Sequence, residues 1–240
     1  MSKKCIIIIA NDPDKSQDLA AFEPVFGKQK SFYLGRAMFF DTLTLSLSIP
    51  RTDTIVCYHP DNSKGLYEQM INLYSHEEFD KKILKKAEDL QLIPQNGDRM
   101  MSRIADSFAK AFELGYKQVT MIGAYCMALD HHLLNAAYLL LNDNDVIIGP
   151  SFGGRYYLFG MSRPLINVFD EVKWESNDFY IRLNENIKQA GAISQELELS
   201  YEVYSPEELN QLILDIERWR SLGDERTAYH TERCLRAIQD

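Results

Sequence analysis

Short apolar runs that end in polar or turn residues recur along the first 150 positions of the chain. They lie at residues 5–10, 53–59, 90–95, 118–123 and 145–150, and each has the length of a strand buried on both faces. Between them, residues 31–49, 99–115 and 130–143 carry apolar positions at i, i+3, i+4 and i+7, which is the spacing of an amphipathic helix. This alternation predicts a mostly parallel sheet with helices on both faces, and therefore a three-layer α/β/α fold.

The pattern changes after Pro150. Residues 154–161 are rich in aromatic side chains and predict an extra strand, which we expect at an antiparallel edge of a mixed sheet. A helix over 177–191 and a strand over 197–204 follow, and Ser205, Pro206 and Glu208 have the N-cap, first-turn and capping-box types that begin a helix. Residues 221–240 predict a last amphipathic helix. We therefore expect one domain over 1–220 and a C-terminal helical extension over 221–240 packed on it.

The composition limits which binding partners and which cellular compartment we expect. The formal net charge of the 240 residues is -9, and no segment concentrates enough Lys and Arg to bind a nucleic acid backbone. The basic run at 81–86 is interleaved with acids and predicts the solvated face of a helix. The first apolar run is too short for a signal peptide or a membrane span, and the cysteines lack CxxC spacing. We expect reduced thiols in a cytoplasmic protein without a membrane span.

Six segments, in this order and spacing, resemble the successive motifs of a group of uncharacterised bacterial transferases in the GT-A glycosyltransferase (nucleotide-diphospho-sugar transferase) superfamily. The segments are GRAMFFDTL, IPQNGDRM, ELGYKQVTMIGAYC, DVIIGPSFGGRYYLFGM, VKWES and YSPEEL. The resemblance covers about residues 5 to 212, and its strongest part runs from Gly149 to Gly160. It implies a GT-A fold that binds a nucleotide or nucleotide sugar over the carboxyl edge of the sheet, where open α/β sheets bind ligands. It also implies Mn or Mg as a cofactor.

Three polar motifs of that family are altered in this chain. The family's Gly-Ser-Asp-Cys-Pro falls on residues 123–127, which places Tyr125 where the family has a metal-binding Asp. A second carboxylate is replaced by Gly153, and residues 19–22 read Leu-Ala-Ala-Phe where the family has Lys-Thr-Arg-Leu. A neutral phenol is a poor ligand for a hard dication. The resemblance therefore leaves the cofactor unknown and implies transferase activity that is weak, metal-independent or lost.

The candidate catalytic residues are Glu175, as a general base toward an acceptor hydroxyl, and Asp98, whose Asn-Gly-Asp context fits a turn equally well. Asp130 is a candidate metal ligand, although its position before an apolar helix favours an N-cap. We expect Tyr156 and Tyr157 to point to opposite faces of a strand, with one of them lining the cleft. The residues expected to contact a nucleotide or its phosphates are Ala10, Asn11, Asp12, Arg99, Arg103, Tyr125, Gly153, Gly154, Arg155 and Tyr156.

Two alternatives to a nucleotide-sugar transferase stay open. One is a nucleotidyltransferase of the same fold. The other is a degenerate transferase that acts as an interaction or scaffold module, with Tyr229, Cys234, Leu235 and Ile238 as contact residues in the last helix. A homodimer is one possible assembly in either case.

Overall fold

The computed structural model describes residues 4–78, 80–152, 154–174 and 176–239. Its strands are β1 Lys4–Asn11, β2 Asp53–His59, β3 Gln91–Pro94, β4 Gln118–Gly123, β5 Val146–Pro150, β6 Tyr156–Met161 and β7 Ser194–Glu196. Its α-helices are α1 Glu23–Phe26, α2 Lys28–Ser48, α3 Lys64–Glu77, α4 Lys81–Glu88, α5 Met100–Glu113, α6 His131–Leu140, α7 Phe179–Gln189, α8 Pro206–Ser221 and α9 Tyr229–Gln239. Two 3₁₀ helices, η1 Asp61–Ser63 and η2 Ile166–Phe169, complete the described elements.

The strands form one mixed sheet in the order β3-β2-β1-β4-β6-β5-β7. Strands β1 to β4 are parallel, as are β5 and β7. Strand β6 is antiparallel to both of its neighbours, β4 and β5. The mostly parallel sheet is confirmed, but the expectation that residues 154–161 form an edge strand is wrong, because β6 pairs on both sides.

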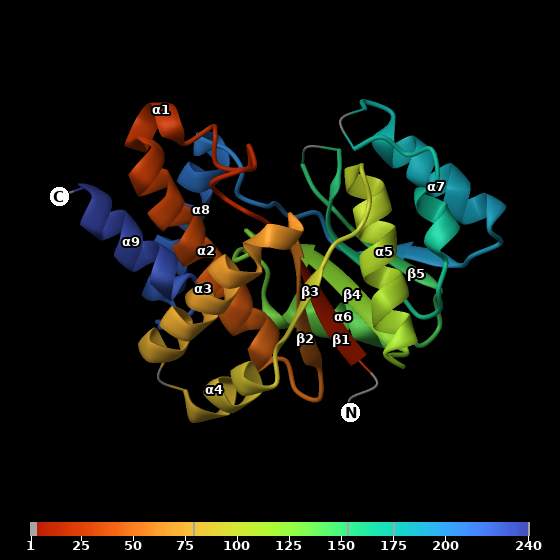
Figure 1. Cartoon of the computed structure of the whole chain (residues 1–240), viewed down its shortest axis with the longest axis horizontal. Helices are drawn as coiled ribbons and strands as arrows, with labels where there is room; N and C mark the ends of the chain where they lie inside the picture. The colour runs from red at the N-terminus through yellow and green to blue at the C-terminus, as the bar shows by residue number, and fades with distance from the viewer. Residues whose placement is uncertain (1–3, 79, 153, 175, 240) are drawn as a thin grey trace.

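Helices cover both faces of the sheet, which confirms the three-layer α/β/α fold (Figure 1). One face packs on α2, α3, α4, α6, α8 and α9, and the other packs on α5, η2 and α7. Alternating strand residues serve the two cores, so the ring of Tyr157 joins the first core and that of Tyr156 joins the second. The opposite orientation predicted for these two tyrosines is confirmed.

Helix α9 is held against α2 by a buried carboxylate. Asp41 of α2 accepts hydrogen bonds from the backbone N–H groups of His230 and Thr231, at 2.9 and 2.8 Å, and from the Thr231 hydroxyl at 2.6 Å. The carboxylate therefore satisfies N–H groups in the first turn of α9, which have no partner inside that helix. Leu235 of α9 is buried in the same interface.

Two segments differ from the sequence prediction. Residues 197–204 do not form a strand; β7 lies just before them, and residues 201–204 cross the carboxyl end of β4, where the Val203 N–H donates to the Tyr125 carbonyl at 3.2 Å. Helix α3 was not predicted, although its buried residues Tyr67, Met70 and Tyr74 have helical spacing. Within the described ranges, no helix has both the length and the apolar character that a membrane crossing requires.

Candidate active-site cleft

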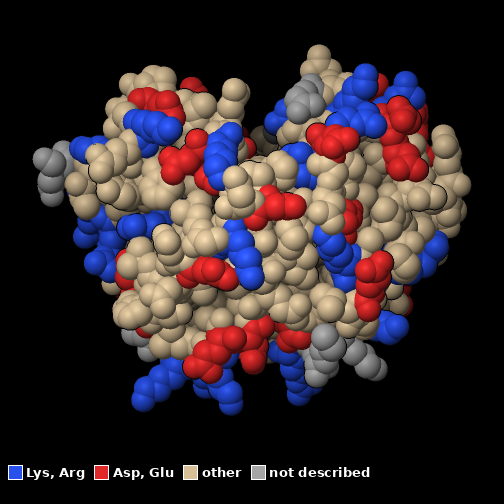
Figure 2. All heavy atoms as spheres, viewed as in Figure 1, with Lys and Arg blue, Asp and Glu red and all other residues tan. Residues whose placement is uncertain are grey.

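A cleft of about 300 Å³ lies at the carboxyl edge of the sheet, between the loop after β1 and the turn between β5 and β6. The space-filling view shows the molecule hollowed at its upper edge, with acidic and basic side chains intermixed around the opening (Figure 2). A smaller hollow of about 30 Å³ adjoins it and shares several of its lining residues. The cleft is lined by Asn11, Gln17, Asp18, Met100, Ser151, Phe152, Arg155, Trp174, Tyr201, Glu202, Tyr204 and Glu208.

The loop after β1 places one of its three predicted residues in the cleft. Asn11 lines it and donates from Nδ2 to Asp18 at 3.0 Å, while the buried Asn11 Oδ1 has no hydrogen-bond partner in the described residues. Ala10 is buried in the sheet. Asp12 is also buried, and it binds the Ser63 hydroxyl at 2.6 Å and the Lys15 ammonium at 2.8 Å.

The chemistry of Asp12 indicates a structural role. Burial alone would raise its pKa, but the hydrogen bonds from Lys15 and Ser63 outweigh that effect and lower the pKa of Asp12 below its ordinary value. Its carboxylate thus ties the loop after β1 to the segment after β2. Farther along the same loop, Leu19 is buried and packs against Gly35 of α2, so this part of the loop is anchored in the core.

The loop after β3 contributes little to the cleft. Asp98 and Arg99 are exposed and do not line it, and Arg99 serves as the N-cap residue of α5. Arg103 lies one turn into α5, where its positive charge acts on the carboxyl of Asp18 and lowers the pKa that burial raises. Arg103 is therefore a basic group beside the cleft rather than on its wall.

The turn between β5 and β6 supplies a cation. Arg155 is exposed and lines the cleft, and its guanidinium lies 5.2 Å from the ring centroid of Trp174 in a cation–π contact. Gly154 has a φ of 72°, which lies in the left-handed region that glycine adopts without strain. Tyr156 lines the small hollow, and its buried hydroxyl has no hydrogen-bond partner in the described residues. Gly153 and Glu175 lie outside the described residues.

Tyr125 lies in the hydrophobic core rather than on the cleft wall. Its side chain is 3% exposed, and its ring contacts that of Tyr204 edge to face at 5.5 Å. Burial raises the pKa of its phenol well above the ordinary value. Tyr125, for which the resemblance implied a metal-binding position, is therefore a neutral packing group in this chain.

Sequence reasoning missed Glu202, which brings a carboxyl group to the end of β4 from another segment. A Cβ added to Gly123 would lie 2.3 Å from its Oε1, so the absence of a side chain at Gly123 makes room for this carboxyl. Glu202 accepts a hydrogen bond from the Cys126 thiol at 3.3 Å. Burial, the largest cause, raises its pKa from 4.5 to about 8. At pH 7 this side chain is therefore mostly protonated and neutral.

The remaining metal candidate has a structural role. Asp130 accepts from the Leu133 N–H at 2.8 Å as the N-cap of α6, which confirms the alternative that its sequence context favoured. No three His, Cys, Asp or Glu side chains in the described part of the chain are arranged so that they could hold a metal ion. The acidic residues that line the cleft are Asp18, Glu202 and Glu208.

Solved structures share this architecture. A protein from Desulfovibrio desulfuricans G20, provisionally described as a nucleotide-diphospho-sugar transferase, is similar over 99% of this chain and 97% of its own, with a TM-score of 0.79 and 26% sequence identity. The 4-diphosphocytidyl-2C-methyl-D-erythritol synthase of Anaerococcus prevotii has a TM-score of 0.57 and 8% identity over 90% of this chain and 97% of its own. A cytidylyltransferase from Leptospira borgpetersenii has a TM-score of 0.51 and 12% identity over 95% of this chain and 98% of its own. The last two comparisons establish the fold alone.

A comparison of sequences places the chain in a family. No curated protein matches it. The family model described as "Uncharacterized protein conserved in bacteria (DUF2064)" matches residues 42–176, which include the last two turns of α2, all of β4 and the turn between β5 and β6. Because the match spans more than half of the 240 residues, this chain belongs to the bacterial DUF2064 family, with the fold of the nucleotide-diphospho-sugar transferases.

Proposed function

We propose that this chain binds a nucleotide or nucleotide sugar in the cleft at the carboxyl edge of the sheet, with transferase activity that is weak, metal-independent or lost. The observation that carries the proposal is the position of the cleft: it opens beyond the ends of β1 and β4, where ligands bind in open α/β sheets. The similarity to a nucleotide-diphospho-sugar transferase over nearly the whole chain supports this choice of ligand.

The charges of the cleft favour a diphosphate without a tightly held dication. The exposed guanidinium of Arg155 is the cation on the cleft wall, and a guanidinium can bind phosphate oxygens in pairs. Burial raises the pKa values of Asp18 and Glu202, which reduces the negative charge that would repel a phosphate. The half-buried Trp174 and the exposed Phe152 provide aromatic surface for a base or sugar ring.

Calorimetric titration with UDP-, GDP- and CDP-sugars, with and without manganese, tests this proposal. We expect micromolar to millimolar binding that changes little with manganese, and about tenfold weaker binding in Arg155→Met, as expected when a charge-assisted hydrogen bond is lost. Arg233→Met is the matched control, because Arg233 is exposed on α9 and does not line the cleft. An equal loss in both variants, or no binding of any nucleotide sugar, would contradict the proposal.

Nucleotidyl transfer is the second candidate, supported by the cytidylyltransferase folds among the similar structures. Product analysis separates the two reactions, because a nucleotidyltransferase releases pyrophosphate from a nucleoside triphosphate whereas a glycosyltransferase releases a nucleoside diphosphate. A non-catalytic scaffold role has less support from the last helix than its sequence suggested. Leu235 is buried against α2, and Cys234 and Ile238 pack against the same core, so these side chains are engaged within the chain.

A further inference from the structure

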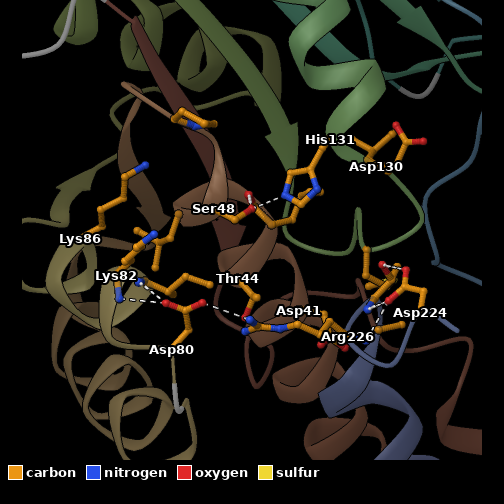
Figure 3. A pocket seen from close by; sticks show the side chains of 18 of the residues that line it. Asp41, Thr44, Ser48, Asp80, Lys82, Lys86, Asp130, His131, Asp224 and Arg226 are labelled. Carbon is orange, nitrogen blue, oxygen red and sulfur yellow. Dashed lines mark hydrogen bonds and ion pairs between the residues drawn. The ribbon is translucent and has the colours of Figure 1, made fainter.

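A second cavity, of about 750 Å³, lies among the helices on one face of the sheet, and it shares no lining residue with the cleft. Its wall is formed by the second half of α2, one side of α4, the segment between β4 and α6 with the start of α6, and the connection between α8 and α9 (Figure 3). The volume lies within the range of pockets that enclose a small organic molecule. Its apolar wall consists of Leu45, Leu47, Ile83, Met127, Leu129 and Ala228.

The four carboxylates that line this cavity already have partners. Asp41 binds the first turn of α9, and Asp130 caps α6. Asp80 caps α4 and pairs with Arg226 at 3.1 Å, and Asp224 accepts from the Arg226 N–H at 2.8 Å. These carboxylates therefore stabilise the starts of α4, α6 and α9 and the connection between α8 and α9.

Two lysines of α4, Lys82 and Lys86, line the cavity and form no ion pair with a described carboxylate. Lys86 donates from Nζ to the backbone carbonyls of Ile49 at 2.5 Å and Thr52 at 3.3 Å, and desolvation lowers its pKa. Lys82 is exposed at the first turn of α4. None of the carboxylates in the described ranges lies within ion-pair distance of either ammonium group.

A polar pair lies on another side of the same cavity. The Ser48 hydroxyl and His131 Nε2 are 2.5 Å apart, and Figure 3 shows both side chains across the cavity from α4. His132 also lines the cavity, which therefore combines apolar walls with ammonium, imidazole and hydroxyl groups. An apolar pocket with a few convergent polar groups is the usual form of a small-molecule site.

We propose that this cavity is a binding site for a small organic carboxylate with an apolar body. The hydrocarbon or ring system would lie against the wall formed by Leu45, Ile83 and Met127, because burial of apolar surface favours association. The carboxylate would reach Lys82 and Lys86, where it would complete ion pairs that the protein leaves open. This site is separate from the nucleotide site proposed above.

Titration of the whole chain with 2-naphthoate tests the proposal, and the neutral isostere 2-naphthalenemethanol measures the part played by charge. We expect 2-naphthoate to bind at least tenfold more tightly than the alcohol, and Lys82→Met to weaken its binding about fivefold to tenfold. Lys85→Met is the matched control: Lys85 is exposed on the same helix but does not line the cavity, so this variant should bind as the wild type does. Lys82 is exposed, so its replacement should leave the fold intact, which circular dichroism checks.

Arg155→Met distinguishes this cavity from the cleft. We expect it to leave 2-naphthoate binding unchanged, because Arg155 lines only the cleft. The proposal would be overturned if 2-naphthoate did not bind, or if the alcohol bound as tightly. It would also be overturned if Lys82→Met and Lys85→Met had the same effect, or if Arg155→Met abolished binding and so placed the probe in the cleft.

Discussion

Replacement of Glu202 by glutamine should change how the stability of the protein depends on pH. In the folded chain, burial raises the pKa of this carboxyl from 4.5 to about 8, with smaller contributions from Glu208 and Asp18. In the unfolded chain it titrates near its ordinary value. Between these pH values the folded protein holds a proton that the unfolded chain has released. The contribution of a protonated Glu202 to stability is therefore fully present below about pH 4.5 and is lost as the pH rises through about 8.

The size of the effect follows from that difference in pKa. Each pKa unit corresponds to roughly 1.4 kcal/mol, so ionisation of Glu202 lowers the free energy of unfolding by up to about 5 kcal/mol across the whole window. Glutamine has nearly the same shape and does not ionise. We expect Glu202→Gln to match the wild type near pH 4.5 and to be more stable by about 3 kcal/mol at pH 7.

Urea denaturation followed by circular dichroism at pH 5, 6, 7 and 8 measures this difference. The gap between variant and wild type should widen by roughly 1.4 kcal/mol for each pH unit. Glu198→Gln is the control, because Glu198 is exposed and its replacement should leave the pH dependence unchanged. Parallel curves for the wild type and Glu202→Gln would refute the assignment of Glu202 as a buried, protonated carboxyl.

Three further substitutions test the packing around the site. Tyr125→Asp should lower the free energy of unfolding measured in urea by roughly 3–5 kcal/mol, because it buries a carboxylate at a core position that is 3% exposed. Manganese titration of this variant should show no new affinity, and tight manganese binding would mean that position 125 can reach the cleft. Asp41→Asn should cost about 1–3 kcal/mol and speed hydrogen exchange in α9, because an NH2 group replaces one of the two carboxylate oxygens that accept from backbone N–H groups; unchanged exchange would argue against its capping role. Gly149→Ala should cost roughly 1–3 kcal/mol in thermal or urea denaturation, since its Cβ would lie 2.5 Å from the Tyr157 ring, and a neutral result would show that this ring can move aside.

The sheet and its helical layers could be predicted from the sequence because their signals are local. Five strands appear as short apolar runs, of which β1, β2, β4 and β5 are buried and β3 is only partly buried. The helix begun at Ser205 has its cap in the sequence and in the structure, where Ser205 accepts from the Glu208 N–H. The place of β6 between β4 and β5 could not be predicted in this way. Strand order depends on pairing between segments far apart in the chain, and the apolar pattern of a single strand does not specify which strands lie beside it.

The candidate site was harder to predict because its key carboxyl belongs to a segment that resembles a strand. Residues 197–204 alternate in the manner of a strand, yet they cross the end of β4 and direct Glu202 toward Gly123. The sequence signal for this carboxyl was one acidic residue, Glu202, between Tyr201 and Val203 and shortly before a helix cap. It became meaningful only when the structure brought it beside the cleft.

The resemblance places a metal-binding aspartate at position 125, but this chain has a buried tyrosine there, and the carboxyl group near the end of β4 is that of Glu202. A metal-binding aspartate is ionised at pH 7 and attracts a dication, whereas Glu202 at a pKa of about 8 must first release a proton to do so. The neutral acid can instead donate a hydrogen bond to a ligand oxygen. Tyr125 packs on Tyr204, which belongs to the same crossing segment as Glu202, so the two residues take part in one packed region at this end of the sheet. With Glu202 protonated, this end of β4 is better suited to donating a hydrogen bond than to holding a permanent metal ion, and under the proposed function Arg155 would supply the positive charge beside a diphosphate.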